Sequence, residues 1–487
     1  MAGSAGDFKR VNFGFADAHT EGAEAPELLR DGFIDEGLIE AAVSDRSFLF
    51  LGYKGSGKTA IAERARLLSE TDFSRFIKIA TLDEFPYTDF KAAAGTAEPQ
   101  PRYPIVWRWL LLVALFELLE SDEAGKERAP LAYRAAAEGL KQLGLIPMPE
   151  LNSLVMKSSK KNFKVELPKF LGIGREQTLV SQDLSLSQAA TSLEDAARAF
   201  PTTNRHVLFL DGLDEILGQR DLQFQALAAL ITAASRLNNS FRKHAKPFKV
   251  VILCRTDIYD RLPGANLNKI RQDHAKSLQW FDGPDQRGQT RLSRLVNLRA
   301  SQSLNRQVNV FSEFLPGRLS GRNTREVILG HTRHTPRDLI QLFGYLQKNS
   351  RNASGITAAE VGTGLRSYSI EYFLPEIRNE MHGYLTPDEI QKAEQVLREH
   401  GNQYFTHQEL IDAQARLGEG ETLDLKTMTH VLFECSAIGF VEQRKGTSRT
   451  MKYSAPHTQL APGKMMWLHP AACRALNIKP QAQNIRD

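Results

Sequence analysis

A glycine-rich turn between a strand pattern and a helix pattern constrains this chain more than any other feature. The apolar run at residues 47–51 leads directly into Gly-Tyr-Lys-Gly-Ser-Gly-Lys-Thr at 52–59, and a strongly helix-forming segment follows at 60–68. Glycines let such a turn curl so that its N–H groups point inward, and the helix that begins there adds the positive end of its dipole. The pattern GxxxxGK[ST] in this context predicts a phosphate-binding loop; the alternative is a plain glycine turn.

The residues of this loop divide the work of holding a nucleotide between them. Lys58 is predicted to bridge the β- and γ-phosphate oxygens, and the hydroxyl of Thr59 to take one coordination position of Mg²⁺. We therefore expect ATP and Mg²⁺ as ligands, although the pattern itself does not distinguish ATP from GTP. The predicted nucleotide-binding residues are Gly52, Tyr53, Lys54, Gly55, Ser56, Gly57, Lys58 and Thr59.

A second apolar strand pattern ends in a group of acids. Residues 206–210 are followed directly by Asp211-Gly-Leu-Asp-Glu215. A carboxylate at the carboxyl end of a buried parallel strand is costly unless a cation or a donor meets it, and that end of the sheet faces the phosphate loop. We predict that Asp211 helps to hold Mg²⁺, that Glu215 positions the attacking water, and that Asp214 is its neighbour or an outer ligand. The alternative is that these aspartates cap a helix.

A third strand pattern, at 249–254, delivers Arg255 to the same edge of the sheet. A guanidinium suits contact with a γ-phosphate because its planar fork matches phosphate geometry. We predict that Arg255 senses the γ-phosphate. The alternative is an ion pair with Asp257 or Asp260.

A second candidate arginine begins a helix further along the chain. In Thr-Pro-Arg-Asp at 335–338, Pro336 suits the first helical position and Arg337 falls in the first turn. A cation is unfavourable there unless an anion compensates it. We predict that the anion is a phosphate of the nucleotide; the alternative is Asp338.

The order of these features resembles the STAND and KAP-type P-loop ATPases of bacteria, which are relatives of the AAA-like initiators and of the NACHT switches. The resemblance covers roughly residues 10–480 and is specific only at the phosphate loop and at Asp-Gly-Leu-Asp-Glu; the segment at 29–37 also looks like a stand-alone bacterial branch of that group. It implies an α/β fold, namely a three-layer P-loop NTPase of the ASCE type with a helical lid and a C-terminal winged-helix-like domain. The chain lacks the membrane helices of KAP proteins and the repeats that follow the winged helix in STAND proteins.

Shifts in pattern and charge divide the chain into four predicted parts. A lead-in at 1–46 precedes a P-loop ATPase domain at 47–285, which carries an insertion at about 83–200. A helical lid without strands is predicted at 286–380, and the winged-helix-like part at 381–487. The boundaries rest on the change from alternating strand and helix patterns to helical spacing alone.

The insertion contains the most apolar segment of the chain, residues 105–119 with Trp107 and Trp109. It is shorter than the ~20 apolar residues that a membrane span requires, and two charged residues interrupt it. We expect a buried core helix; the alternative is a helix that faces a membrane interface or a partner. A hairpin is also predicted at Asn162–Gly174.

Composition narrows the class of protein. The chain has 487 residues, of which 42% are hydrophobic and 24% charged, which excludes a disordered or collagenous chain. The net charge of +5 is small, so any nucleic-acid contact requires a local basic patch. Cys254, Cys435 and Cys473 lie far apart, which argues against a zinc site or a disulfide framework. With no signal-peptide pattern at the N-terminus, we expect a cytoplasmic location and no membrane contact.

The C-terminal part divides sharply by charge. Residues 384–440 carry four basic and ten acidic residues, and 441–487 carry eight basic and two acidic residues. An apparent β-wing at 439–454 falls in the basic half, which could bind DNA phosphates. However, the segment expected to read bases offers only Lys426 and His430, so we favour a regulatory or docking role over DNA binding. The three helical patterns before the wing lie at 387–399, 406–416 and 426–437.

Together these features predict an ATP-hydrolysing molecular switch in which closure of the lid is read through Arg255 and Arg337. Turnover should be slow unless a partner or an oligomer supplies a missing group; Arg236 or Arg242 of a neighbouring subunit is a candidate. The family resemblance implies a homo-oligomer or an effector partner, in bacterial stress or anti-phage defence. Two other functions remain open: an ATP-gated DNA-binding protein of initiator or loader type, and a nucleotide-dependent scaffold with little turnover.

Overall fold

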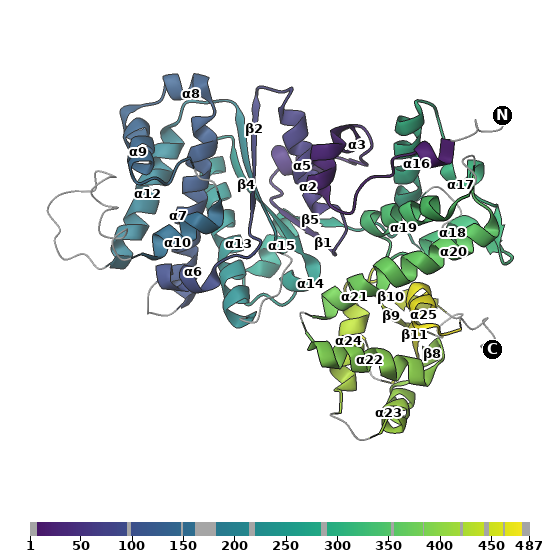
Figure 1. The fold of residues 1–487 in the computed structure, drawn as a ribbon. Coiled ribbons are helices and arrows are strands. Elements are labelled where there is room, and N and C mark those ends of the chain that lie inside the picture. The colour runs from purple at the N-terminus through teal and green to yellow at the C-terminus, as the bar shows by residue number, and fades with distance from the viewer. Residues whose placement is uncertain are drawn as a thin grey trace. The chain divides into compact units, whose positions relative to one another are not determined.

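The fold is shown in Figure 1. This computed structural model describes residues 7–94, 99–147, 150–160, 182–213, 220–283, 290–351, 355–382, 384–418, 422–442, 448–460 and 463–479. The chain forms two compact units. Unit 1 consists of Met1–Ile34, Gly55–Gly57 and Gln279–Asp487, and unit 2 of Asp35–Lys54 and Lys58–Leu278.

Unit 2 is built on a five-stranded sheet in the order β2-β3-β4-β1-β5, in which all paired strands are parallel. The three central strands are almost entirely buried, and for this reason they read in the sequence as continuous apolar runs. This sheet confirms the predicted α/β fold class. The strands are β1 (Leu49–Gly52), β2 (Arg75–Thr81), β3 (Arg205–Asp211), β4 (Phe248–Arg255) and β5 (Ala275–Leu278).

The register of the sheet lines up the carboxyl ends of its strands. Gly52, at the end of β1, is paired with Arg255 at the end of β4. Thr81, at the end of β2, is paired with Asp211 at the end of β3. Residues far apart in the sequence therefore meet at one edge of the sheet, where ligands bind in folds of this type.

Helices cover both faces of this sheet, which makes unit 2 a three-layer structure (Figure 1). Helix α5 (Lys58–Ser69) packs on one face, and α7 (Pro99–Glu120) and α13 (Arg220–Lys243) pack together on the other. The other helices of unit 2 are α4 (Leu38–Val43), α6 (Tyr87–Ala94), α8 (Glu123–Glu127), α9 (Leu131–Gln142), α10 (Leu151–Ser159), α12 (Gln182–Ala199), α14 (Thr256–Tyr259) and α15 (Leu267–His274).

The tryptophan-rich segment forms the centre of α7 and is a core helix, as predicted. Trp107 and Trp109 are both 0% exposed, and the indole N–H of Trp107 donates to the carbonyl of Ala226 at 2.8 Å. Among the described residues, no helix is long and apolar enough to cross a membrane. The helices of the insertion other than α7 were not predicted, and the hairpin predicted at Asn162–Gly174 lies outside the described residues.

Unit 1 begins with the lead-in, whose aromatic residues join a helical core. Phe8 and Phe13 are buried, and Phe13 packs against Phe343 of α19. Glu21 and Arg299 form a bidentate ion pair of 2.9 and 2.6 Å, with both side chains almost fully buried. The helices here are α1 (Asp7–Arg10), α2 (Ala18–Glu24), α3 (Pro26–Arg30), α16 (Arg291–Leu304), α17 (Val310–Glu313), α18 (Thr324–Leu329), α19 (Pro336–Asn349), α20 (Ala358–Tyr368), the π-helix η1 (Ser369–Phe373) and α21 (Leu374–Met381).

The predicted lid contains a strand pair that the sequence did not indicate. Two strands of two residues each, β6 (Arg318–Leu319) and β7 (Arg322–Asn323), form an antiparallel pair in a region predicted to have no strand. That prediction was wrong because so short a pair has no room for an alternating pattern.

The C-terminal part of unit 1 has the predicted winged-helix-like arrangement of three helices and an antiparallel sheet, in the order β10-β9-β11-β8, and it ends in a further helix, α25, that was not predicted. Capping boxes fix the starts of the first two helices, at Thr386 with Glu389 and at Thr406 with Glu409. The elements are α22 (Pro387–His400), β8 (Tyr404–Phe405), α23 (His407–Arg416), α24 (Leu425–Glu434), β9 (Ile438–Glu442), β10 (Ser448–Met451), β11 (Met466–Leu468) and α25 (Pro470–Leu476).

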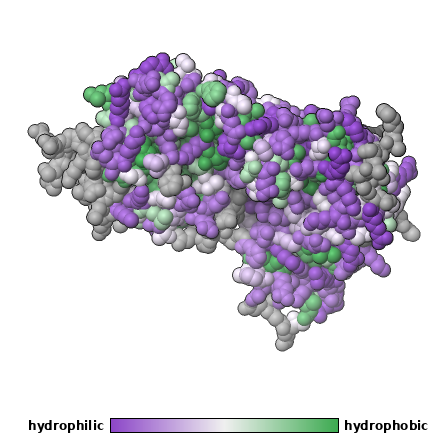
Figure 2. Space-filling model, turned by 45° about the horizontal axis from the view of Figure 1, so that its top comes forward, coloured by the Kyte–Doolittle hydropathy of each residue, from purple (hydrophilic) through white to green (hydrophobic). Residues whose placement is uncertain are grey.

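The surface in Figure 2 is mainly hydrophilic, with hydrophobic residues in small groups among polar ones. The most exposed large hydrophobic side chains among the described residues are Phe73 at 88% and Leu131 at 83%, both in unit 2. Single exposed residues of this kind are normal for a folded protein and do not define a docking surface.

Candidate nucleotide-binding site

The loop between β1 and α5 has the backbone that a phosphate-binding loop requires. Gly55 and Gly57 adopt φ angles of +79° and +92°, in the left-handed region that favours glycine. Lys58 is the first residue of α5 and is only 4% exposed. Its ammonium donates to the carbonyls of Gly52 and Tyr53, at 3.4 Å each, so the cation lies against the start of the loop.

Thr59 and Asp211, the two predicted magnesium ligands, are in direct contact. The hydroxyl of Thr59 donates to Oδ2 of Asp211 at 2.5 Å, although the residues are 152 positions apart in the sequence. Asp211 is 4% exposed, and its Oδ1 accepts the backbone N–H of Gly212 at 2.9 Å. A hydroxyl and a carboxylate are the hard oxygen ligands that Mg²⁺ prefers, so this pair fits the ion.

Arg255 is the last residue of β4, and its side chain forms an ion pair with Asp257. Its guanidinium binds both carboxylate oxygens of Asp257, at 3.0 and 2.7 Å, and both side chains are buried. Burial acts to raise the pKa of Asp257, but the attraction of Arg255 outweighs it and holds the pKa below its ordinary value. The ion pair with Asp257, one of the two alternatives weighed from the sequence, is therefore formed. The role of Arg255 in sensing the γ-phosphate stays a prediction.

The tip of the loop contains a buried hydroxyl that fits a phosphate donor. Ser56 is 3% exposed, and within the described part of the chain its Oγ has no hydrogen-bond partner. Its carbonyl accepts the indole N–H of Trp280 at 2.9 Å. A buried hydroxyl of this kind is costly unless a ligand pairs with it.

Arg337 lies in the first turn of α19, where Pro336 occupies the first helical position as predicted. Its Nε donates to the carbonyl of Ala16 at 2.7 Å, and its backbone N–H lies 3.3 Å from the carbonyl oxygen of Gly55, within unit 1. The alternative that Asp338 compensates Arg337 was wrong, because the Asp338 carboxylate is held by Arg333 instead.

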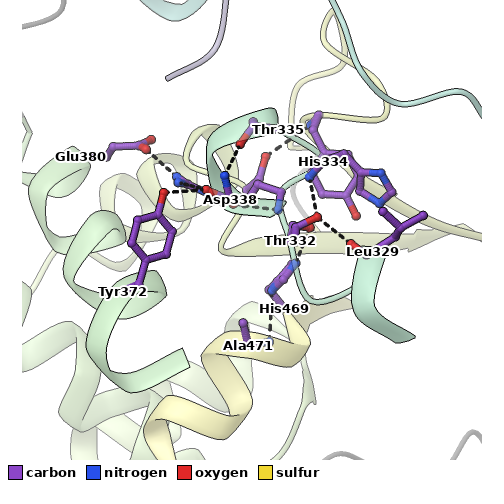
Figure 3. A network of polar contacts seen from close by, with 12 residues as sticks. Leu329, Thr332, His334, Thr335, Asp338, Tyr372, Glu380, His469 and Ala471 are labelled. Atoms are coloured by element: carbon purple, nitrogen blue, oxygen red, sulfur yellow. Dashed lines mark hydrogen bonds and ion pairs between the residues drawn. The ribbon is translucent and has the colours of Figure 1, made fainter. Parts of the chain in front are cut away.

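Asp338 is the centre of a buried network around the start of α19 (Figure 3). Its carboxylate accepts three bonds of 2.9 Å from Arg333, one from the backbone and two from the guanidinium, and the hydroxyl of Tyr372 donates to it at 3.1 Å. Arg333 also reaches Glu380 of α21. Burial works to raise the pKa of Asp338, but Arg333 outweighs it and keeps the pKa below its usual value. The network fixes the helix that carries Arg337.

Three buried histidines surround this network. His469 caps α25, accepting the N–H of Ala471, and its Nε2 lies 3.3 Å from the carbonyl of Thr332 (Figure 3). Nε2 of His331 accepts the Nε–H of Arg474 at 3.0 Å. Burial lowers the pKa of His331 and of His334 to about 4, and that of His469 to about 3, so all three are neutral at pH 7.

Asp83 is an acid beside the predicted site that the sequence patterns did not reveal. Gly212 has a φ of +78°, and a Cβ built there would lie 2.4 Å from Oδ1 of Asp83, which follows β2. The signal was present, because Leu-Asp-Glu follows β2 as acids follow β3, but β2 itself was not recognised. Asp214 and Glu215 lie outside the described residues.

The basic residues of the winged-helix-like part are largely engaged within it. Lys452 is 6% exposed and forms a 2.8 Å ion pair with Glu434. Lys464 pairs with Glu442 at 2.6 Å. The guanidinium of Arg449 lies over the rings of Tyr404 and Trp467, 5.4 and 5.3 Å from their centroids. The other two cations of the predicted wing, Arg444 and Lys445, lie outside the described residues.

A family model matches part of this chain, and two solved structures are similar to most of it. Residues 290–374 match the family model described as a FunZ-associated C-terminal helical domain, which falls within the segment predicted as the lid. No curated protein matches the chain in sequence. Among solved structures, the chain is similar to the Aeropyrum pernix Orc1 protein in complex with DNA, with 12% identity, coverage of 93% of this chain and 94% of that one, and a TM-score of 0.40. It is also similar to Cdc6p from Pyrobaculum aerophilum, with 12% identity, 93% coverage of each chain and a TM-score of 0.29. These values are too low for either likeness to bear on the function of this chain.

Proposed function

We propose that this chain binds and hydrolyses Mg²⁺-ATP and that it acts as a nucleotide-controlled molecular switch. The observation that supports this most is the 2.5 Å contact of Thr59 with Asp211. It joins the end of the glycine loop to the acidic end of β3, which is the pairing of hydroxyl and carboxylate that P-loop NTPases use to hold magnesium.

In this proposal each residue of the loop has a role. The backbone N–H groups of the loop and Lys58 bind the β- and γ-phosphates, and the buried hydroxyl of Ser56 donates to a phosphate oxygen. Thr59 and Asp211 hold Mg²⁺, which neutralises phosphate charge when it is bound. Glu215 orients the attacking water, with Asp214 beside it.

Two arginines extend the proposal from catalysis to switching. Arg255 would contact the γ-phosphate at the cost of rearranging its pair with Asp257, so its contact reports the nucleotide state. Arg337 would supply a second contact, from a helix start that the Asp338 network holds rigid. A switch requires contacts that differ between two states, and both arginines offer such contacts.

We assign the winged-helix-like part a regulatory or docking role. Lys452, Lys464 and Arg449 already have partners inside this part, so a DNA phosphate would have to displace them. The resemblance seen in the sequence extends the proposal to a sensor or regulator that works with an effector in bacterial stress or anti-phage defence, as an oligomer or with a partner that raises its turnover.

Phosphate release from ATP at varied Mg²⁺ concentration tests this proposal. Asp211→Asn should raise the Mg²⁺ requirement and reduce turnover, whereas Asp221→Asn, at an exposed acid in the first turn of α13, should leave both unchanged. Glu215→Gln should bind ATP normally and reduce the hydrolysis rate by about 10²–10⁴-fold, since it removes a general base. Wild-type turnover in Asp211→Asn would contradict the magnesium site. ATP binding by the wild type without turnover would favour the scaffold function.

A further inference from the structure

A basic pocket lies at the edge of the unit 2 sheet opposite the glycine loop. It has a volume of about 270 Å³ and is formed where β1, β3 and β4 begin, together with the end of α13. Its lining includes one carboxylate, Asp45, and five cations, Arg46, Arg205, Arg242, Lys246 and Lys249. Such an excess of positive charge in a concave site attracts anions.

Lys249 is the most buried of the five cations that line this pocket, and we call its ammonium the floor of the pocket. Lys249 is the second residue of β4 and is 9% exposed. Its Nζ donates to the carbonyls of Ala41 and Asp45, at 2.7 Å each. Among the described residues these two acceptors use two of the three ammonium hydrogens, and neither is an anion. The direct contacts of the ammonium are therefore carbonyl dipoles, Asp45 and Glu40 act on its charge without a direct contact, and a third donor remains for a ligand.

The arginines at the rim are also without anionic partners. Within the described part of the chain, the guanidiniums of Arg46 and Arg205 have no ion pair and no side-chain hydrogen bond, although five charge-assisted donors are available on each. Arg242 donates to the amide oxygen of Asn239, and Lys246 to the carbonyl of Phe200, so these two are engaged by neutral groups. The carboxylate of Asp45 accepts hydrogen bonds from the hydroxyl of Ser47 and from the backbone N–H of Arg46.

We propose that this pocket is a binding site for a small phosphate-bearing anion, distinct from the nucleotide site. Guanidinium forks at the rim and an ammonium at the floor match the oxygens of a phosphate group better than those of a neutral ligand. The pocket is slightly smaller than the ~300 Å³ at which drug-sized ligand sites begin, so it suits a compact anion such as pyrophosphate or a sugar phosphate. It is also at the opposite strand ends from Gly52, Asp211 and Arg255.

Calorimetric titration of the full chain with pyrophosphate tests this site. The titrated chain carries Lys58→Ala, which weakens binding at the glycine loop. Excess Mg²⁺-ADP occupies any affinity that the loop retains, so that the loop does not contribute to the pyrophosphate signal. The double variant Arg46→Gln, Arg205→Gln should weaken pyrophosphate binding at least about tenfold, because each arginine contributes charge-assisted hydrogen bonds. Both residues are exposed, so folding is retained. The control is Lys243→Gln, which removes a charge next to Arg242 from outside the pocket lining and should change the affinity less than twofold.

The pH dependence of binding gives a second readout, which identifies the floor of the pocket. Burial lowers the pKa of Lys249 to about 7; Arg205 and Arg242 lower it as well, while Asp45 and Glu40 of α4 raise it. Sulfate is the probe for this measurement, because it carries two negative charges at every pH between 6 and 8.5. Because a bound anion raises this pKa, sulfate affinity should be highest below pH 7 and fall by up to about tenfold per pH unit above it.

Three results would overturn the proposal. The first is pyrophosphate affinity in the double variant within twofold of the parent. The second is sulfate affinity that is independent of pH between 6 and 8.5. The third is a short DNA duplex or an acidic peptide that displaces pyrophosphate at lower concentration than a sugar phosphate does, since the pocket would then belong to a macromolecular surface. Loss of ATP binding at the glycine loop would leave these results unchanged, so this proposal and the proposed function fail separately.

Discussion

At the scale of single residues, buried charge is placed where it either serves the site or holds it rigid. Thr59 meets Asp211 directly, whereas Arg255 is held by Asp257 and Arg333 by Asp338. Two buried ions of opposite sign in good geometry do little for stability as a pair, but removal of one leaves the other uncompensated. Each pair therefore fixes a local geometry more than it stabilises the fold.

Asp338→Asn should lower the free energy of unfolding by about 3–5 kcal/mol, because it leaves the buried guanidinium of Arg333 short of its main counter-charge. Urea unfolding followed by circular dichroism measures this. Asp388→Asn, at an exposed acid in the first turn of α22, is the matched control and should cost less than about 1 kcal/mol. Equal, small losses in both variants would show that the network is not needed for stability.

At the scale of elements, sequence patterns located the buried strands and missed the partly exposed ones. β1, β3 and β4 are apolar runs buried on both faces, and each was predicted to within two residues. β2 reads Arg-Phe-Ile-Lys-Ile-Ala-Thr and is mostly half-buried, so its lysine and arginine obscured the pattern. β5 has only four residues, two of them exposed, and depends on pairing with β1.

The same limit applies to the candidate site. The loop, Lys58, Thr59 and Asp211 could be predicted because a local pattern specifies each of them. Asp83 could not, because its place beside Gly212 depends on the pairing of β2 with β3, which no local pattern encodes. The partner of Asp338 was missed for a similar reason: Arg333 is five residues away, and the turn at His334, with a φ of +51°, brings it back to the start of α19.

The wing offers a prediction at this scale. The double variant Arg444→Glu, Lys445→Glu should leave DNA binding absent or unchanged, and it should alter ATP turnover or nucleotide-dependent assembly, because a docking surface makes contacts in only one of two states. DNA affinity at varied salt concentration, with ATP turnover of the same samples, measures both effects. A tight, salt-sensitive interaction with DNA that the double variant abolishes would instead establish DNA binding.

At the scale of the whole molecule, stability should depend on pH in a range set by buried histidines. Among the described residues these include three in unit 1 and His206 in unit 2, where burial likewise lowers the pKa of His206 to about 4. The pKa values of His331, His334 and His469 are lowered to about 4, 4 and 3 by burial, against about 6.5 in the unfolded chain. Between these values the unfolded chain binds more protons, so the stability that is full above pH ~6.5 is lost as the pH falls toward 4.

Unfolding of the full chain in urea at pH 7, 6 and 5 checks this dependence. Each buried histidine should contribute a loss of up to about 1.4 kcal/mol per pH unit below 6.5. His334→Gln should reduce this slope by the contribution of one group, because His334 is neutral in the folded protein and gains a proton when the chain unfolds below pH 6.5. In the folded protein the imidazole of His334 packs against Phe281 and Tyr453. A stability that is constant from pH 7 to 5 would contradict the burial of these histidines.

Calorimetric titration of the chain with ATP in the presence of Mg²⁺ tests the central claim, that the glycine loop of this α/β sheet holds a nucleotide. Wild type and Lys91→Ala, which alters an exposed lysine of α6, should bind ATP equally. Lys58→Ala should lose at least about tenfold in affinity, because it removes the cation that bridges the phosphates. Unchanged affinity and turnover in Lys58→Ala would contradict the account at its base.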